Sequence, residues 1–99
     1  MLVIMGTVRI DPDRLDDARP AMERMIAASN AEPGCLDYAY AQDLLDPGLI
    51  HISERWTDRA ALKAHSQSPH MGEWRKAISK VGVVERNLRL FETGEGEAI

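Results

Sequence analysis

The side chains best suited to chemistry lie between residues 50 and 70. Glu54 and Trp56 occupy alternate positions of an extended segment, so a carboxylate and an indole share one largely apolar face. His65 and His70 follow on either side of a short break. Because imidazole exchanges protons near neutral pH, His65 is the best candidate for a catalytic base. Glu54 must be either paired or functional, since a carboxylate on an apolar surface is costly.

Each of these residues also has a structural interpretation. His65 could cap carbonyl groups at a helix end, and Glu54 could accept a structural hydrogen bond. Tyr38 and Trp56 could stack on an aromatic ligand, although core packing is the commoner role of such side chains. The sequence alone leaves these alternatives open.

A metal site is not expected from this pattern. His65 and His70 are separated by the break at Ser68 and Pro69, and the carboxylates near them in the sequence are of the solvent-facing type. No cysteine stands at ligand spacing from them. We therefore predict neither a metal ion nor a cofactor, and the chain also lacks a phosphate-binding glycine loop.

Size and composition restrict the class of protein. The 99 residues suffice for one core, so we expect a single domain over residues 1–91 and a flexible tail over residues 92–99. A net charge of -4 argues against nucleic acid, and no apolar stretch is long enough to cross a membrane. The lone cysteine, Cys35, fits a reducing cytoplasm. A small molecule is the expected ligand.

Hydrophobic periodicity and turn signals divide the chain into six main elements. Alternation predicts strands, Asp11-Pro12 and Thr57-Asp58 mark helix starts, and Gly82 ends the last helix. The predicted order is a strand over 2–10, a helix over 12–29, strands over 35–42 and 49–56, a short helix over 58–65 continued by a helix over 69–81, and a strand over 84–90. This order predicts an α+β fold of the ferredoxin-like βαββαβ type with a four-stranded antiparallel sheet.

The first strand is apolar on both faces near its start, where Leu2, Val3, Ile4 and Met5 follow one another. A domain of this size can lay helices over only one face of its sheet. We expect a second copy of the chain to cover the other face, which predicts a homodimer.

The chain resembles the antibiotic biosynthesis monooxygenase family, which includes quinol monooxygenases. The resemblance runs from about Leu2 to Phe91 and rests on the following residues: Glu32-Pro33-Gly34-Cys35-Leu36 with Tyr38, Asp46-Pro47, Glu54 with Trp56, Ala61-Leu62, His65, and Ser68-Pro69-His70. It implies a dimeric α+β barrel with a ligand cavity between each sheet and its helices. It also implies oxidation of phenolic or quinol substrates by dioxygen without metal or flavin.

Two branches of that family give different expectations. The haem-degrading branch has a Trp and a His on its helices, and these positions fall on His65 and Arg75 here, so the haem ligand is lost. The branch of isomerases for phosphorylated sugars resembles this chain at His65 and Pro69-His70. Isomerisation of a small hydroxyketone therefore stays open.

These inferences combine into one functional hypothesis, a cytoplasmic, cofactor-independent monooxygenase that oxidises a small aromatic or quinol compound with dioxygen. The alternatives are the isomerase and a ligand-binding dimer without catalysis. The predicted catalytic residues are His65 and Glu54, and the predicted substrate-binding residues are Tyr38, Trp56, His70 and Trp74.

Overall fold

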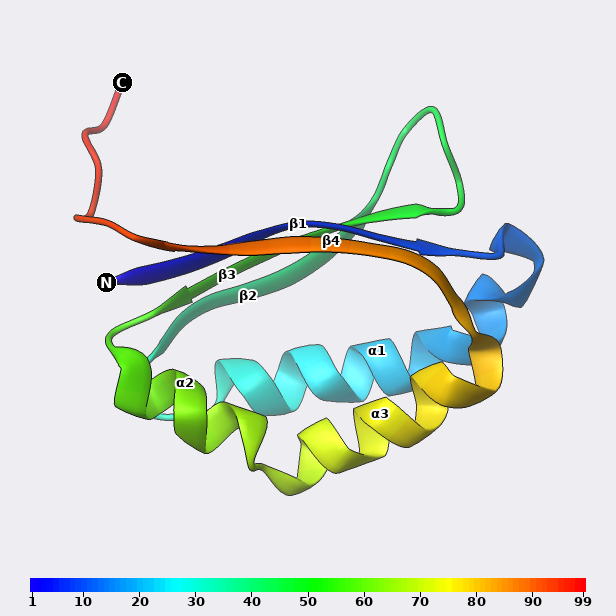
Figure 1. Cartoon of the computed structure of the whole chain (residues 1–99), viewed down its shortest axis with the longest axis horizontal. Coiled ribbons are helices and arrows are strands. Elements are labelled where there is room, and N and C mark those ends of the chain that lie inside the picture. The colour runs from blue at the N-terminus through cyan, green and yellow to red at the C-terminus, as the bar shows by residue number, and fades with distance from the viewer.

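The computed structural model describes all 99 residues as one sheet with helices on one side (Figure 1). The ferredoxin-like fold predicted from the order of elements is confirmed. The elements are β1 (Leu2–Ile10), a 3-10 turn (Pro12–Arg14), α1 (Leu15–Asn30), β2 (Cys35–Gln42), β3 (Leu49–Trp56), α2 (Arg59–Ser66), α3 (Pro69–Val81) and β4 (Val83–Glu92).

The four strands form one antiparallel sheet in the order β2-β3-β1-β4. Its register fixes which side chains share a face, because successive residues of a strand point to opposite sides. Glu54 of β3 lies between Ile4 of β1 and Tyr38 of β2. All three point to the side of the sheet that the helices cover, so the carboxylate stands in the middle of an otherwise apolar and aromatic row.

The core lies between this inner face and the helices (Figure 1). At one end, Val8 and Ile10 of β1 and Ile50 of β3 pack with Met22 of α1. At the other end, Trp56 is fully enclosed in a second cluster with Leu2, Met25 and Tyr38. Most inner residues of β4 are more exposed than those of the other strands, which leaves open space beside them.

The starts of α2 and α3 are confirmed where the sequence indicated them, whereas the first predicted helix opens as a 3-10 turn and α1 begins only at Leu15. The Asp58 carboxylate accepts a hydrogen bond from the Ala61 amide at 2.8 Å and caps α2. The Ser68 hydroxyl accepts one from the Met71 amide and caps α3, with Pro69 at the first helical position. His65 lies in the last turn of α2 and His70 in the first turn of α3, on either side of Ser68.

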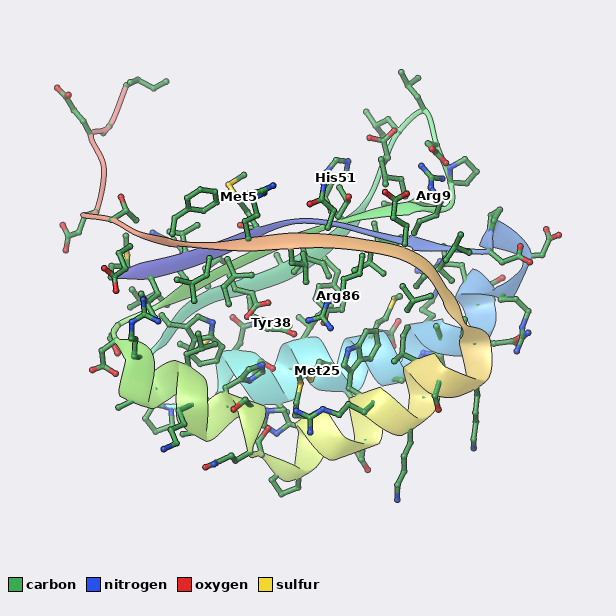
Figure 2. The ribbon with its side chains drawn as sticks, viewed as in Figure 1. Met5, Arg9, Met25, Tyr38, His51 and Arg86 are labelled. Atoms are coloured by element: carbon green, nitrogen blue, oxygen red, sulfur yellow. The ribbon has the colours of Figure 1, made fainter.

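The outer face of the sheet is not covered by any part of the chain (Figure 1). Met5 is 54% exposed and Phe91 is 47% exposed there. Figure 2 shows Met5, Arg9 and His51 on this side, away from the helices. The face is therefore mixed in polarity, although the first strand is apolar on both faces near its start. The loop between β2 and β3 rises on the same side and carries Leu44, which is 99% exposed.

Residues 93–99 form no regular secondary structure after β4 ends at Glu92. The flexibility of this tail and the domain boundary near residue 91 stay predictions. None of the three α-helices combines the length and the hydropathy needed to cross a lipid bilayer.

The close approach of β1 and β4 gives a test of the fold. Gly6 has φ +150°, and a Cβ there would lie 1.9 Å from the backbone oxygen of Asn87. We predict that Gly6→Ala lowers the free energy of unfolding by at least about 2 kcal/mol, as measured by urea denaturation. The matched control is Gly72→Ala in α3, where a Cβ meets nothing within 4 Å and helix propensity should add up to ~1 kcal/mol. Equal effects of the two substitutions would contradict the strand packing.

Candidate active site

A cavity of about 570 Å³ lies between the inner face of the sheet and helices α2 and α3. Cavities of roughly 300–1,000 Å³ hold small organic ligands in other proteins. Its walls are mostly apolar, with Ile4, Ile52 and Leu88 on the sheet side. Such a wall suits an aromatic ligand, which is bound by burial of apolar surface and oriented by a few polar groups.

The polar groups of the cavity come from different elements. They include Tyr38 and Tyr40 of β2, Glu54 of β3, His65 of α2 and Arg86 of β4, and the lining also includes Arg59, Lys63, Ser66 and Arg89. Figure 2 shows Tyr38 and Arg86 in the space between the sheet and the helices. None of the ion pairs in the chain includes Arg86, so its guanidinium is available to an anionic ligand.

The Glu54 side chain is held by the core. The residue is only 7% exposed, and its carboxylate accepts a hydrogen bond from the Trp56 indole N–H at 3.0 Å. Burial raises the pKa of Glu54, while the indole N–H and the nearby His65 oppose part of this rise. Glu54 is thus a carboxyl that holds its proton more tightly than an exposed glutamate.

The two tyrosines act as a pair. Their hydroxyl oxygens are 2.7 Å apart, and the ring centroids of Tyr38 and Tyr40 are separated by 5.4 Å. Burial raises the pKa of Tyr40 to about 12 and raises the pKa of Tyr38 as well. Both hydroxyls therefore stay protonated near neutral pH. Because one hydroxyl donates to the other, the pair has one proton left to donate to a ligand, and both hydroxyls are poor bases.

His65 occupies the last turn of α2 and is only 3% exposed. Its ring packs against Trp56, with 4.6 Å between the ring centroids. The Nδ1 atom lies 3.0 Å from Glu32 Oε1, and because a carboxylate only accepts hydrogen bonds, Nδ1 carries the proton in the neutral ring. Nε2 has no hydrogen-bond partner in the chain, and it is not fully enclosed by protein atoms. Since His65 lines the cavity, Nε2 is the atom that a ligand can reach.

His70 lies behind His65 and does not line the cavity. It lies in the first turn of α3, and its Nε2 contacts the same Glu32 Oε1 atom that His65 contacts. The ring centroids of His65 and His70 are 5.8 Å apart. One carboxylate from the turn after α1 thus connects both imidazoles.

The structure brings four of the six predicted site residues to the cavity, namely Tyr38, Glu54, His65 and Trp74. Trp56 is fully buried, and it reaches the site only through its hydrogen bond to Glu54. His70 reaches it only through Glu32. The roles of all six in catalysis and binding stay predictions.

Sequence reasoning missed Glu32, Tyr40 and Arg86 as site residues. Tyr40 could have been found, because it stands two positions after Tyr38 on the same strand face. Glu32 gives no local signal, since it lies 33 positions before His65. Asp58 and Glu73, which are near the histidines in the sequence, are exposed as expected, whereas the Glu32 side chain comes from a distant turn and is only 14% exposed.

The raised pKa of Glu54 predicts a pH-dependent effect on stability. The folded protein binds this proton more tightly than the unfolded chain does, so its stability falls as pH rises from the ordinary value of 4.5 through the raised pKa. Glu54→Gln keeps an acceptor for the Trp56 indole and removes the charge. We expect a higher melting temperature than wild type at about pH 8 and no gain at about pH 4. A gain in melting temperature that does not depend on pH would contradict the raised pKa of Glu54.

Comparison with known proteins places this architecture in a family. The family model for antibiotic biosynthesis monooxygenase matches residues 1–77. The chain is 28% identical over 104 residues to the probable quinol monooxygenase YgiN of Escherichia coli, a match that covers 95% of this chain and 99% of that protein.

Solved structures agree with the family match. A Deinococcus radiodurans protein superposes with a TM-score of 0.90 at 26% identity, covering 100% of this chain and 98% of that chain. The protein PA3566 of Pseudomonas aeruginosa gives a TM-score of 0.77 at 27% identity, covering 91% and 88%. The chain therefore belongs to the antibiotic biosynthesis monooxygenase family.

Proposed function

We propose that the protein is a cofactor-independent monooxygenase that oxidises a small quinol or related phenol with dioxygen. The observation that carries the proposal is the geometry of His65. Glu32 holds the proton on Nδ1, and Nε2 is left as a free base at the apolar cavity. The relationship to a protein named as a quinol monooxygenase supports the choice of substrate class.

The reaction starts with a proton transfer. His65 Nε2 takes the proton of a substrate hydroxyl, and Glu32 stabilises the imidazolium that forms. Arg86 and the free proton of the Tyr38–Tyr40 hydroxyl pair offset the negative charge of the substrate anion. Ionisation is the step that matters, because an electron-rich anion can pass an electron to dioxygen whereas the neutral phenol reacts poorly.

The remaining steps need no other reductant. The substrate radical and superoxide combine at a ring carbon, and protonated His65 returns its proton to the resulting peroxide. Loss of water then leaves a hydroxyquinone, so one oxygen atom enters the product and the other becomes water. The quinol supplies every electron that dioxygen accepts. The protein contributes the base, the electrostatic environment and an apolar cavity.

The isomerase alternative requires both histidines to exchange protons with the substrate. Only His65 lines the cavity, so the geometry favours oxidation over a reaction that uses two imidazoles. Glu54 remains a candidate for a second proton carrier, since it lines the same cavity and has a raised pKa.

The proposal also includes a homodimer in the cytoplasm, in which two outer sheet faces pack together as a barrel. Met5 and Phe91 provide partly exposed apolar surface on this face, and the loop between β2 and β3, which rises on the same side, contains the exposed Leu44. Apolar side chains gathered on one uncovered face are typical of an interface with a partner.

His65 is tested by turnover. We expect His65→Gln to lower kcat for quinol oxidation at least about 100-fold, measured as oxygen uptake with a panel of quinols. His51→Gln is the matched control, because His51 lies on the outer face of β3 and its partner is Asp43. Full turnover by His65→Gln would remove that residue from the mechanism. Product formed in the absence of oxygen would contradict the monooxygenase proposal and support the isomerase alternative.

The homodimer is tested by mass in solution. We expect sedimentation to give twice the mass of one chain, and Met5→Glu to give a monomer, because it buries a charge at the interface. Ala27→Glu serves as the control, since Ala27 is exposed on α1 at the opposite side of the molecule. A wild-type protein that sediments as a monomer would contradict the proposed assembly.

A further inference from the structure

Three metal-binding side chains converge beside the cavity. Glu32 Oε1 lies 3.0 Å from His65 Nδ1 and contacts His70 Nε2, and one donor atom from each residue lies within 4.8 Å of the others. We propose that Glu32, His65 and His70 form a binding site for a divalent transition-metal ion such as Zn²⁺. This goes beyond the proposed oxidation, which uses no metal.

The set of ligands fits such an ion. Imidazole nitrogen and carboxylate oxygen bind Zn²⁺ at about 2.0–2.2 Å, and three protein ligands leave a further position for water. Donor atoms on one tetrahedral ion are then roughly 3.3 Å apart. The three donors lie within 4.8 Å of one another, so side-chain movements that bring the most distant pair together would let one ion contact all three.

Burial and charge also favour a cation here. The side chains of His65, Glu32 and His70 are 4%, 14% and 18% exposed. A carboxylate in such a position needs a positive partner, and neither of its ion pairs involves Lys or Arg. A metal ion would supply the charge, and the more exposed His70 gives it a path from solvent.

The three ligands are held by well-defined local structure. Glu32 sits in a turn in which its amide donates to Ser29 O at 3.1 Å and its carbonyl accepts from the Cys35 amide at 3.2 Å. His65 lies in the last turn of α2, and the Ser68 hydroxyl donates to the His65 carbonyl at 2.6 Å. His70 follows Pro69 in the first turn of α3. The fold therefore positions the donors before any ion binds.

Metal and proton compete for the same atom. An ion on His65 Nδ1 displaces the proton that Glu32 otherwise holds there, and the remaining ring proton then sits on Nε2. In the proposed reaction Nε2 is the base, so an ion at this site would block turnover. This consequence rests on the proposed function, whereas binding of the ion does not.

The chain contains its own control for histidine chemistry. Its third histidine, His51, pairs with Asp43 at 2.8 Å on the outer face of the sheet. The His51 side chain is 50% exposed, and the pair offers only two donors. A weak surface interaction of a metal ion with histidine would depend on His51 as much as on His65 or His70.

The test is a metal titration of the full chain, prepared without a histidine tag and stripped with a chelator. We expect one Zn²⁺ per chain by calorimetry, and with Co²⁺ the visible absorption of a site with nitrogen and oxygen ligands. Glu32→Gln and His70→Asn should each lower the affinity at least about tenfold. His51→Asn should leave it unchanged.

Circular dichroism of the metal-free variants shows whether each one is folded. Absence of stoichiometric binding by the wild-type protein would overturn the proposal, and so would loss of binding in His51→Asn. Neither result depends on turnover. A protein that binds Zn²⁺ but oxidises no quinol would support the metal site and remove only the proposed function.

Discussion

The structure of the site depends on the Glu32 carboxylate. This carboxylate belongs to the turn that leads from α1 to β2. It contacts His65 near the end of α2 and His70 near the start of α3. A largely buried carboxylate is costly unless it is paired, so its two imidazole contacts keep these segments together. The same contact fixes the tautomer of His65. Stability at this corner and the chemistry of the cavity therefore have one cause.

The cavity exists because the helices cover the sheet unevenly. α1 packs against β2 and α3, while the inner side of β4 stays more exposed. Tyr38, Tyr40 and Glu54 point into the space that this leaves. Burial raises the pKa values of all three, so they act there as proton donors or hydrogen-bonding groups and leave the role of base to an imidazole.

The fold could be predicted from local signals in the sequence. The caps at Asp58 and Ser68 and the alternation around Glu54 each depend on residues a few positions apart, and the structure confirms them. Pairings that only the completed fold creates were not predictable. Glu32 meets His65 because two helices and a hairpin bring their ends together. Trp56 lies in the core because the register aligns it with Leu2. The mixed polarity of the outer face was not predicted either. It follows from the alternation of polar and apolar side chains along strands such as β1, which is apolar on both faces only near its start.

The central claim is that Glu32 leaves His65 Nε2 free of a proton and accessible from the cavity. It is tested most directly by ¹⁵N NMR of the histidine rings in metal-free protein at a pH where the ring is neutral. The account predicts that His65 carries its proton on Nδ1, and that Glu32→Gln shifts the ring toward the other tautomer. A wild-type ring protonated on Nε2 would contradict this claim, because the nitrogen at the cavity would then have no free electron pair to offer the substrate.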